Sequence, residues 1–512
     1  MSAAQGAGFP DEAAGPDQGR RRAPRSFAAT LGWTVLGAVL PGTAFLAAGR
    51  RRLGAAVLLL VALLLAAVIW LATAGRQTAV RLAVDTGSLL WVAAVVGVVT
   101  LVWIVVIVAG YRMLAAPGTT RARHTFGALV VGLLVVAVAL PAVYVGQVLI
   151  AQRGLVDGVF ADDRESATVE ETPDPFGDQE RVNVLLLGGD GGEGRDGVRT
   201  DTVVVASIAT GTGATTLFSL PRNLEDLPFP ADSPLAEIYP DGFDAGSESE
   251  SLLNAVYRNG PAEYPDVLGP TADPGADFLK LGVGEALGLE LDYFVLVNLD
   301  GFSRLVDALG GVTVNVNYYV PIGGIPDSRM LPDDYIAPGP DQLLDGPRAL
   351  DFARGRFGLT DYDRMARQRC TIGAIVEAAD PVTLLRSYQE LAATTQDIVS
   401  TDIPRSALDD FVDLAFLVKD ASITSVVFDE TLIEPAYPDY DEMRRIVAEA
   451  IAPESGRAAE SSAPGTSPAP VENPDAPPPP EDPAADVGDA CAYDRAQAAA
   501  ALAAGEPPTR NG

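Results

Sequence analysis

Long apolar runs alternate with short arginine-containing segments along the first 150 residues. Three runs of about 20 uncharged residues can each cross a hydrocarbon layer ~30 Å thick as a helix. They lie at 53–74, 88–109 and 126–150. A weaker run at 28–48 is interrupted by Pro41-Gly42. The pattern predicts an α-helical transmembrane region over 26–150, preceded by a basic N-terminus at 1–25.

The distribution of arginine favours one topology for these runs. Arginine clusters at 20–25, 50–52 and 112–123 contrast with Arg76 and Arg81 between the first two strong runs. Because cytoplasmic loops carry the excess of positive charge, we expect a cytoplasmic N-terminus, three crossings, and the rest of the chain outside the cell. If the weak run also crosses, either the rest of the chain is cytoplasmic or the N-terminal arginines are external.

Beyond the membrane region the composition changes several times. Residues 151–180 are acidic and aperiodic, which predicts a stalk, and residues 181–452 have the periodicity of a folded domain. Residues 453–489 are rich in Pro, Ala, Ser and acidic residues, which is typical of an extended or disordered linker. A short terminal segment at 490–512 contains Cys491 and an alanine-rich stretch that can form a helix.

Within 181–452, short β-branched runs alternate with helical patterns. The expected strands are 183–189, 202–209, 215–221, 293–301 and 312–322. The expected helices are 277–290, 300–311, 346–358 and 363–380. The alternation predicts an α/β fold with a mixed central sheet and helices on both faces.

Charge and composition exclude several classes of function. Residues 1–150 carry 12 arginines and 4 acidic residues, whereas the whole chain has a formal net charge of −32. The remainder is therefore strongly acidic, which argues against nucleic acid as a partner. One histidine, His124, and two cysteines exclude a Ser-His-Asp triad in this part, a His-rich zinc site and a cysteine-based metal centre. The chemistry of this part of the chain must therefore use carboxylates and arginines, with or without an added metal.

A glycine pattern after the first expected strand invites a nucleotide-binding interpretation. Gly189, Gly191 and Gly194 match GxGxxG. That fingerprint requires a helix directly after the glycine loop, but here a polar loop leads into another expected strand. We therefore expect no bound nucleotide.

Charged residues gather at the ends of the expected strands. Asp190 ends the first strand, and Arg199 and Asp201 open the second. Arg222 follows the third. Further charged and polar residues of the same kind are Arg354, Arg356, Asp361, Arg364 and Gln368. Side chains at strand ends collect at one edge of an α/β sheet, where two carboxylates and several arginines suit a metal-bridged pyrophosphate. The alternative is a set of surface ion pairs.

These segments resemble the LytR-CpsA-Psr family of cell-wall ligases. The matching sequences stand in family order between residues 183 and 378: VNVLLLGGD, VRTDTVVVASI, TTLFSLPRN, VDALGGVTVNV, PGPDQLLDGPRALDFARGR and DYDRMARQR. The resemblance implies an external, membrane-anchored phosphotransferase. Such an enzyme moves a glycopolymer from a polyprenyl-pyrophosphate carrier to peptidoglycan and forms a phosphodiester.

The resemblance also implies roles for individual residues. Asp190 and Asp201 are the expected ligands of Mg²⁺ (or Mn²⁺), and Asp361 is expected to orient the arginines. The expected pyrophosphate-binding residues are Arg199, Arg222, Arg354, Arg356, Arg364 and Gln368. The expected catalytic residues are Arg199, Asp201, Arg222 and Asp361, with the proton acceptor left open between the two aspartates. The family usually has aspartate after the Pro-Arg pair, but this chain has Asn223, which cannot act as a base.

Two other functions use parts of the same sequence. A hydrolase that cleaves the same pyrophosphate would use the same residues, whereas a non-enzymatic envelope regulator or glycan-binding module would not need them. An apolar channel for the lipid can involve residues that would otherwise be ordinary core. They are Leu279, Leu281, Val283, Leu287, Phe294, Leu296, Phe302 and Leu305.

The two cysteines are expected to form a disulfide. On the helix expected at 363–380, Cys370 lies beside the small side chains of Ala366 and Ala374, which leave a shallow groove for another segment. The expected core stripe of this helix is nearly opposite: Met365, Ile372, Ile375, Val376 and Ala379. The segment around Cys491 can reach the groove through the long linker, and an external location permits oxidation. The alternative is two free thiols.

Overall fold

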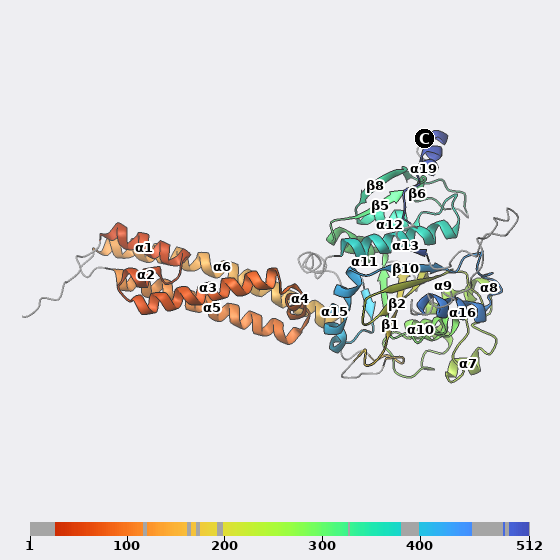
Figure 1. Cartoon of the computed structure of the whole chain (residues 1–512), viewed down its shortest axis with the longest axis horizontal. Coiled ribbons are helices and arrows are strands. Elements are labelled where there is room, and N and C mark those ends of the chain that lie inside the picture. The colour runs from red at the N-terminus through yellow and green to blue at the C-terminus, as the bar shows by residue number, and fades with distance from the viewer. Residues whose placement is uncertain are drawn as a thin grey trace, which may run out of the picture. The chain divides into compact units, whose positions relative to one another are not determined.

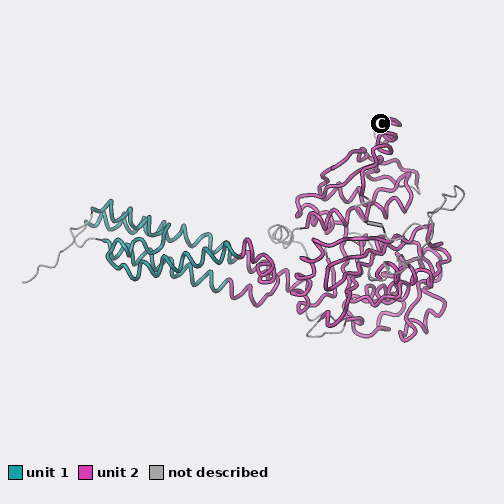
Figure 2. Tube along the Cα trace, in the orientation of Figure 1, with its two compact units in different colours: residues 1–70, 93–146 teal, residues 71–92, 147–512 magenta. Residues whose placement is uncertain are grey.

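A computed structural model gives the fold of the chain (Figure 1). It describes residues 26–115, 120–160, 165–169, 175–191, 198–325, 328–379, 399–452, 485–486 and 491–510. The chain divides into two compact units, residues 1–70 with 93–146 and residues 71–92 with 147–512 (Figure 2). The linker expected at 453–489 lies almost entirely outside the described residues.

The apolar N-terminal part forms helices. They are α1 (Phe27–Val39), α2 (Thr43–Ala47), α3 (Arg51–Ala72), α5 (Thr86–Leu114) and α6 (Arg121–Val159). Among the described residues, α3, α5 and α6 are long and apolar enough to cross a membrane, whereas α1 is shorter. Helix α1 stops before Pro41, and Gly42 has φ 104°, a left-handed conformation that glycine adopts without strain. The expected interruption of the weak run therefore lies between α1 and α2.

Helix α6 continues beyond the apolar run, so the first part of the expected stalk, up to Val159, is helical rather than aperiodic. Val156 and Val159 are buried, and Val156 packs in a cluster with Val182 and Leu408. The Gln152 side chain also donates to the carbonyl oxygen of Ala83, at 2.6 Å. Long-range contacts of this kind stabilise helical turns that show no obvious pattern in the sequence.

A seven-stranded mixed sheet forms the centre of the second unit, in the order β11-β10-β3-β2-β1-β4-β9. The strands are β1 (Arg181–Gly189), β2 (Thr200–Ala209), β3 (Thr215–Leu220), β4 (Tyr293–Asn298), β9 (Val399–Thr401), β10 (Ile423–Val427) and β11 (Ala485–Asp486). Strand β1 is antiparallel to β2 and parallel to β4, and β3 is antiparallel to β2 and parallel to β10. The expected mixed α/β fold is confirmed.

Helices cover both faces of this sheet (Figure 1). On one face lie α9 (Leu253–Glu263), α10 (Pro274–Leu287) and α16 (Tyr440–Ile451). On the other lie α13 (Asp361–Ala378) and α15 (Leu408–Lys419). Leu185 and Phe218 face the first set, whereas Val204 and Leu217 pack with Ile372 of α13. Because both faces are buried, the strands read as nearly continuous apolar runs.

A smaller layer packs on the far side of α13. It contains α11 (Leu299–Ala308), β5 (Val312–Val316), β6 (Val320–Ile322), β7 (Asp334–Ile336), β8 (Gly339–Leu344) and α12 (Gly346–Arg354). The single strand expected at 312–322 is wrong, because β5 pairs with β8 and β6 with β7. The break falls at Asn317, whose side-chain amide donates to the carbonyl oxygen of Ala492, at 3.0 Å.

The remaining elements are short or peripheral. They are α4 (Arg76–Val84), α7 (Pro234–Ile238), α8 (Glu248–Ser251), η2 (Arg405–Ala407) and α19 (Arg495–Ala504). Helix α4 belongs to the second unit and contacts α15 through an ion pair between Arg81 and Asp413. The Arg81 Nε atom lies 2.8 Å from Asp413 Oδ1.

Cys370 and Cys491 form the expected disulfide, with their Cα atoms 5.1 Å apart. The expected core stripe of α13 is only partly correct. Cys370 and Ala374 are buried among Val314 and Val316 of β5, whereas Ile375 and Val376 are half-buried. The helix has a second buried face because the small layer packs on it opposite the sheet.

We predict that breaking this disulfide destabilises the small layer and releases the terminal segment. The bond closes a sequence separation of 121 residues, for which the chain-entropy treatment gives a stabilisation of about 5 kcal/mol as an upper value. Thermal unfolding in detergent micelles should therefore shift to lower temperature in Cys370→Ser and Cys491→Ser to similar extents. Unchanged melting in both variants, or alkylation of both thiols in the unreduced protein, would contradict the prediction.

Candidate active site

Asp190 and Arg199 face each other where β1 ends and β2 begins. The Asp190 amide donates to the carbonyl oxygen of Arg199, at 3.0 Å, and the Arg199 amide donates to Asp190 Oδ1, at 2.8 Å. The register between the two strands shifts at Gly188/Gly189. The backbone and one carboxylate oxygen together close this end of the hairpin.

Asp201 lies at the same edge, and its Oδ1 atom receives two side-chain hydrogen bonds. Arg222 Nη1 lies 3.1 Å away and Asn254 Nδ2 lies 3.3 Å away. Burial by itself would raise the pKa of Asp201, but the Arg222 guanidinium and these hydrogen bonds outweigh it and hold that pKa below its ordinary value. Asp201 is therefore an anion in the folded protein.

Arg222 connects the sheet edge to helix α13. Its Nε atom lies 3.3 Å from Asp361 Oδ1, and Asp361 Oδ2 in turn lies 3.0 Å from Arg364 Nη2. Asp201, Arg222, Asp361 and Arg364 thus form a row of alternating charges, here called the charge row. Its two arginines come from the end of β3 and the first turn of α13.

Arg364 is the most buried member of the charge row, with a side chain that is 5% exposed. Burial lowers the pKa of its guanidinium, Asp361 opposes this effect, and the nearby charges of Arg222 and Arg356 add to it. Its Nε atom is buried and has no hydrogen-bond partner among the described residues. A buried donor without a partner is costly, so this edge is suited to a ligand with negatively charged oxygen atoms.

Arg199, which was expected to bind the pyrophosphate, forms an ion pair within the protein. Its Nη2 atom lies 2.7 Å from Glu250 Oε1 in α8. Glu250 also pairs with Arg258 and accepts from Asn259 Nδ2, at 2.8 Å. Arg199 therefore lies next to the charge row along the chain but is held by the segment that precedes α9.

The other three residues expected to bind the pyrophosphate differ in their exposure to solvent. Arg356 is half-buried and within electrostatic range of Arg364, and Gln368 is half-buried one turn further along α13. Arg354 is exposed in the last turn of α12, where its charge acts on Asp351. The contacts of the described residues join Arg222, Asp201, Asp361 and Arg364, and they do not include Arg354.

Sequence reasoning missed Asn254 and Glu250. Asn254 is 7% exposed, and its backbone N–H donates to the backbone carbonyl oxygen of Arg222, at 3.0 Å. Its side-chain orientation follows from Asp201, because a carboxylate oxygen requires the NH₂ group. The buried Oδ1 atom then has no partner among the described residues. A polar residue inside the apolar pattern of α9 was the available signal.

The donor set is compatible with a hard divalent cation. Among the described residues no group of three or more His, Cys, Asp or Glu side chains could hold a metal by themselves. Mg²⁺ commonly uses one or two protein carboxylates and completes its shell with phosphate oxygens and water. Asp201 is ionised and receives both of its hydrogen bonds on Oδ1, which suits such a ligand, and Asp190 is a second carboxylate at the end of the neighbouring strand.

The residues proposed for a lipid channel are mainly core residues. Leu279, Val283, Leu287, Phe294 and Leu296 belong to the cluster between the sheet and helices α9, α10 and α16. Leu281 packs against that cluster, and Phe302 packs against the small layer. Leu305 is half-buried in α11.

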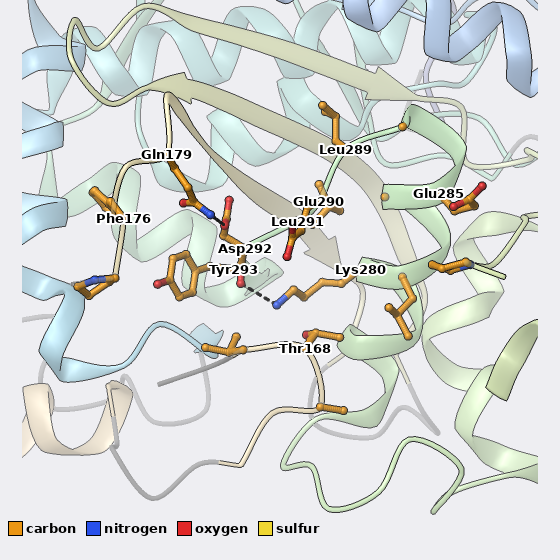
Figure 3. A pocket seen from close by; sticks show the side chains of 18 of the residues that line it. Thr168, Phe176, Gln179, Lys280, Glu285, Leu289, Glu290, Leu291, Asp292 and Tyr293 are labelled. Carbon is orange, nitrogen blue, oxygen red and sulfur yellow. Dashed lines mark hydrogen bonds between the residues drawn. The ribbon is translucent and has the colours of Figure 1, made fainter. Parts of the chain in front are cut away.

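A large cavity of about 1000 Å³ lies elsewhere, beside α10 and the start of β4 (Figure 3). Lys280 there donates to the carbonyl oxygen of Asp292, at 2.8 Å, and pairs with Asp402, at 2.7 Å. The positive charge of Lys280 is therefore already paired with a carboxylate of the protein. Tyr293 begins β4, whereas the charge row follows the end of β3 (Pro221 onward), and β4 runs parallel to β1. The cavity is thus at the opposite end of the strands and is not the candidate active site.

The fold and the charge row define an α/β protein with membrane-type helices and an arginine-containing sheet edge. A model of the LytR_cpsA_psr family matches residues 158–440. This match covers more than half of the chain, and the chain belongs to that family.

Several characterised proteins are similar to the chain. The polyisoprenyl-teichoic acid–peptidoglycan teichoic acid transferase TagU of Enterococcus faecalis is 29% identical over 238 residues, 44% of this chain and 62% of that protein. Biofilm regulatory protein A of Streptococcus mutans is 24% identical over 240 residues, 46% of this chain and 53% of that protein. The chain thus spans less than two thirds of the length of these relatives.

Solved structures also match. Protein gbs0355 of Streptococcus agalactiae is 25% identical, with a TM-score of 0.37, over 49% of this chain and 77% of that chain. B. subtilis TagT is 19% identical, with a TM-score of 0.36, over 57% of this chain and 97% of that chain.

We predict that Arg222→Met destabilises the second unit by about 1 kcal/mol at neutral pH, since it leaves two half-buried, partly solvent-screened carboxylates with fewer partners. The pKa of Asp201 is lower in the folded protein than in the unfolded chain, where it is near 3.8. This difference stabilises the wild type at pH values above 3.8, and the stabilisation is lost as the pH falls through the folded-state pKa. The deficit of the variant should therefore shrink below about pH 4.

Thermal unfolding of the full-length protein in micelles at several pH values measures this deficit. Arg445→Met is the matched control, because Arg445 forms exposed ion pairs on α16, and its loss should have little effect on thermal unfolding. A deficit for Arg222→Met that is equal at pH 7 and pH 3.5 would rule out the proposed coupling.

Proposed function

We propose that the chain is a divalent-cation-dependent phosphotransferase that moves a glycopolymer from a polyprenyl-pyrophosphate carrier to peptidoglycan. The charge row is the observation that supports this function most strongly. It places the buried guanidinium group of Arg364 and the half-buried one of Arg222 at one sheet edge, near an ionised carboxylate. The similar transferase of Enterococcus faecalis, by its name, acts on polyisoprenyl-linked teichoic acid and peptidoglycan.

The proposed reaction exchanges one phosphate ester partner for another. A hydroxyl oxygen of the acceptor attacks the sugar-bearing phosphorus, and a new P–O bond forms. The bond from this phosphorus to the bridging oxygen breaks, so that polyprenyl phosphate leaves with the electron pair. The hydroxyl proton passes to a carboxylate or to solvent. Such reactions depend mainly on positioning and charge neutralisation.

The residues of the charge row take different parts in this reaction. Arg222 and Arg364 bind the pyrophosphate oxygens, and Asp361 fixes the direction of both guanidinium groups by pairing with each. Mg²⁺ or Mn²⁺, held by Asp201 and Asp190, would neutralise further phosphate charge. The low pKa of Asp201 makes it a weak base and a suitable cation ligand. The phosphate site is completed by residues near the charge row. Arg199 precedes Asp201 by two residues, Gln368 follows Arg364 by one helical turn, and Arg356 lies within electrostatic range of Arg364.

Hydrolysis is the second candidate, because water in place of the acceptor hydroxyl would need the same residues. The two reactions differ in their product, which carries either a phosphodiester to peptidoglycan or a free phosphate. A purely regulatory role is a weaker alternative, since it gives no reason for the paired arginines of the charge row.

We further propose that the second unit lies outside the cell. The arginine clusters on the opposite side of the expected crossings support this orientation, as does the external location of peptidoglycan. The disulfide is consistent with an oxidising compartment.

We predict that Asp201→Asn lowers transfer at least about 100-fold, since it removes negative charge that holds the cation and orients Arg222. Reconstituted full-length protein, a short polyprenyl-pyrophosphate glycan and peptidoglycan fragments provide the assay, with linked and free phosphate products measured separately. Mn²⁺ affinity, measured by electron paramagnetic resonance, should fall at least about tenfold. Asp441→Asn, a surface control whose side chain is 95% exposed, should change neither. Full transfer by Asp201→Asn would exclude the assignment.

We predict that protease added to intact protoplasts removes the second unit while an N-terminal tag stays protected. The expectation follows from the arginine distribution, because the N-terminal cluster at 20–25 is assigned to the cytoplasm. Immunoblots against both ends of the chain give the measurement. Protection of the acidic part together with the tag would reverse the topology.

A further inference from the structure

A second surface feature lies beside the candidate active site. A groove of about 500 Å³ is lined by aromatic and acidic residues from the segment after β3, the segment after α7 and the segment before α16. Its aromatic and acidic lining residues are Asp226, Phe229, Tyr239, Asp241, Tyr437 and Tyr440. None of them belongs to the charge row.

Tyr437 is the most exposed large hydrophobic side chain among the described residues, at 79%. Even Trp91, in one of the membrane-type helices, is slightly less exposed, at 76%. A tyrosine on a water-facing loop leaves a flat aromatic face open to a ligand.

The floor of the groove is a packed aromatic cluster. The Tyr239 ring lies 5.7 Å from the Phe229 ring and 5.1 Å from the Phe243 ring, between centroids. Tyr239 is 9% exposed, so its body is held in the core while one edge lines the groove. The floor is therefore rigid.

The walls are fixed by backbone contacts on both sides. Tyr440 donates its hydroxyl to the carbonyl oxygen of Glu225, at 2.6 Å, and the Glu225 amide donates to that of Pro435, at 3.0 Å. Asp226 has φ 51°, and a Cβ atom on Gly242 would come within 2.4 Å of its carbonyl oxygen. Aspartate tolerates this left-handed conformation, and the close approach of Gly242 keeps the backbone of this wall in place.

The charge of the groove limits its ligand. Asp226 and Asp241 line it, and its lining residues include no lysine or arginine. The neighbouring Arg444 is paired with Glu285 and Asp441. A polyanion would be repelled here, whereas an uncharged polyhydroxyl chain can stack its C–H faces on tyrosine and donate hydroxyls to the carboxylates.

The groove is also close to the charge row. Asp226 follows Arg222 by four residues, so their Cα atoms are separated by no more than about 14 Å. This separation is short enough for an oligosaccharide of a few sugar units to extend from the groove to the charge row.

We propose that this groove binds uncharged sugar units of the acceptor glycan and so guides its hydroxyl to the charge row. The inference rests on the proposed transfer to a glycan acceptor and adds the place where that acceptor binds. Tyr437 supplies the stacking surface, and Asp226 and Asp241 accept hydrogen bonds from sugar hydroxyls. The preformed floor and walls reduce the entropic cost of binding.

The test uses full-length protein in nanodiscs and a β-1,4-linked N-acetylglucosamine tetramer as the probe. Calorimetric titration should show saturable binding that weakens about tenfold in Tyr437→Ala, since the stacking surface is lost. Tyr437→Phe keeps the ring and should bind like the wild type. Leu343→Ala is the matched control, because Leu343 is 67% exposed on β8 and away from the groove. A glycerol-phosphate oligomer tests the charge argument and should not bind in a Tyr437-dependent manner.

Three results would overturn the proposal: absence of saturable tetramer binding, wild-type affinity in Tyr437→Ala, or equal losses in Tyr437→Ala and Leu343→Ala. Tyr437-dependent binding of the anionic oligomer would overturn it as well. Arg222→Ala separates the two proposals, because it should abolish transfer but leave tetramer binding intact. Tetramer binding without any transfer by the wild type would reject the proposed reaction alone, and transfer without tetramer binding would reject the groove alone.

Discussion

The bridge that Arg222 makes between Asp201 and Asp361 is the interaction on which the candidate site depends. Asp201 comes from the beginning of β2, and Asp361 comes from the first turn of α13. The two residues are 160 positions apart and belong to different layers of the fold. Arg222 can bridge them because it follows the last residues of β3, at the edge where the sheet and the helix meet.

The charge balance of this edge supports the proposed binding of an anionic ligand. Arg222, Arg364 and nearby Arg356 are opposed by Asp201 and Asp361. Removing charges from water costs free energy unless they are fully paired. The surplus of guanidinium groups favours an anionic ligand such as the pyrophosphate of the proposed carrier. The same surplus explains why Arg364 keeps an unpartnered donor in the described part of the chain.

Helix α13 connects this site to the rest of the second unit. Its first turn carries Asp361 and Arg364, and its middle carries Cys370, which is linked to Cys491. One side of the helix packs on the sheet through Ile372, and the other packs on β5 through Ala374. The position of the site arginine therefore depends on two cores and on a covalent link to the terminal segment.

Local patterns determined the layers of the protein and the charged edge of its sheet. Long uncharged runs identified α3, α5 and α6, and β-branched runs identified β1 to β4, because helix and strand periodicity follow from neighbouring residues. The charged residues at the strand ends identified the site edge for the same reason. The spacing of Cys370 and the two alanines also indicated a face open to another segment.

Tertiary structure alone decided which partners these residues have. Arg199 pairs with Glu250, Asn254 supports Asp201, and Asn317 divides an expected strand by binding the terminal segment. The helical extension of α6 to Val159 depends on burial against distant residues in the same way. Local sequence determines secondary structure and the side of a strand or helix on which a residue lies. Pairing across 50 to 175 positions depends on the packed layers, because only packing brings such residues within hydrogen-bonding distance.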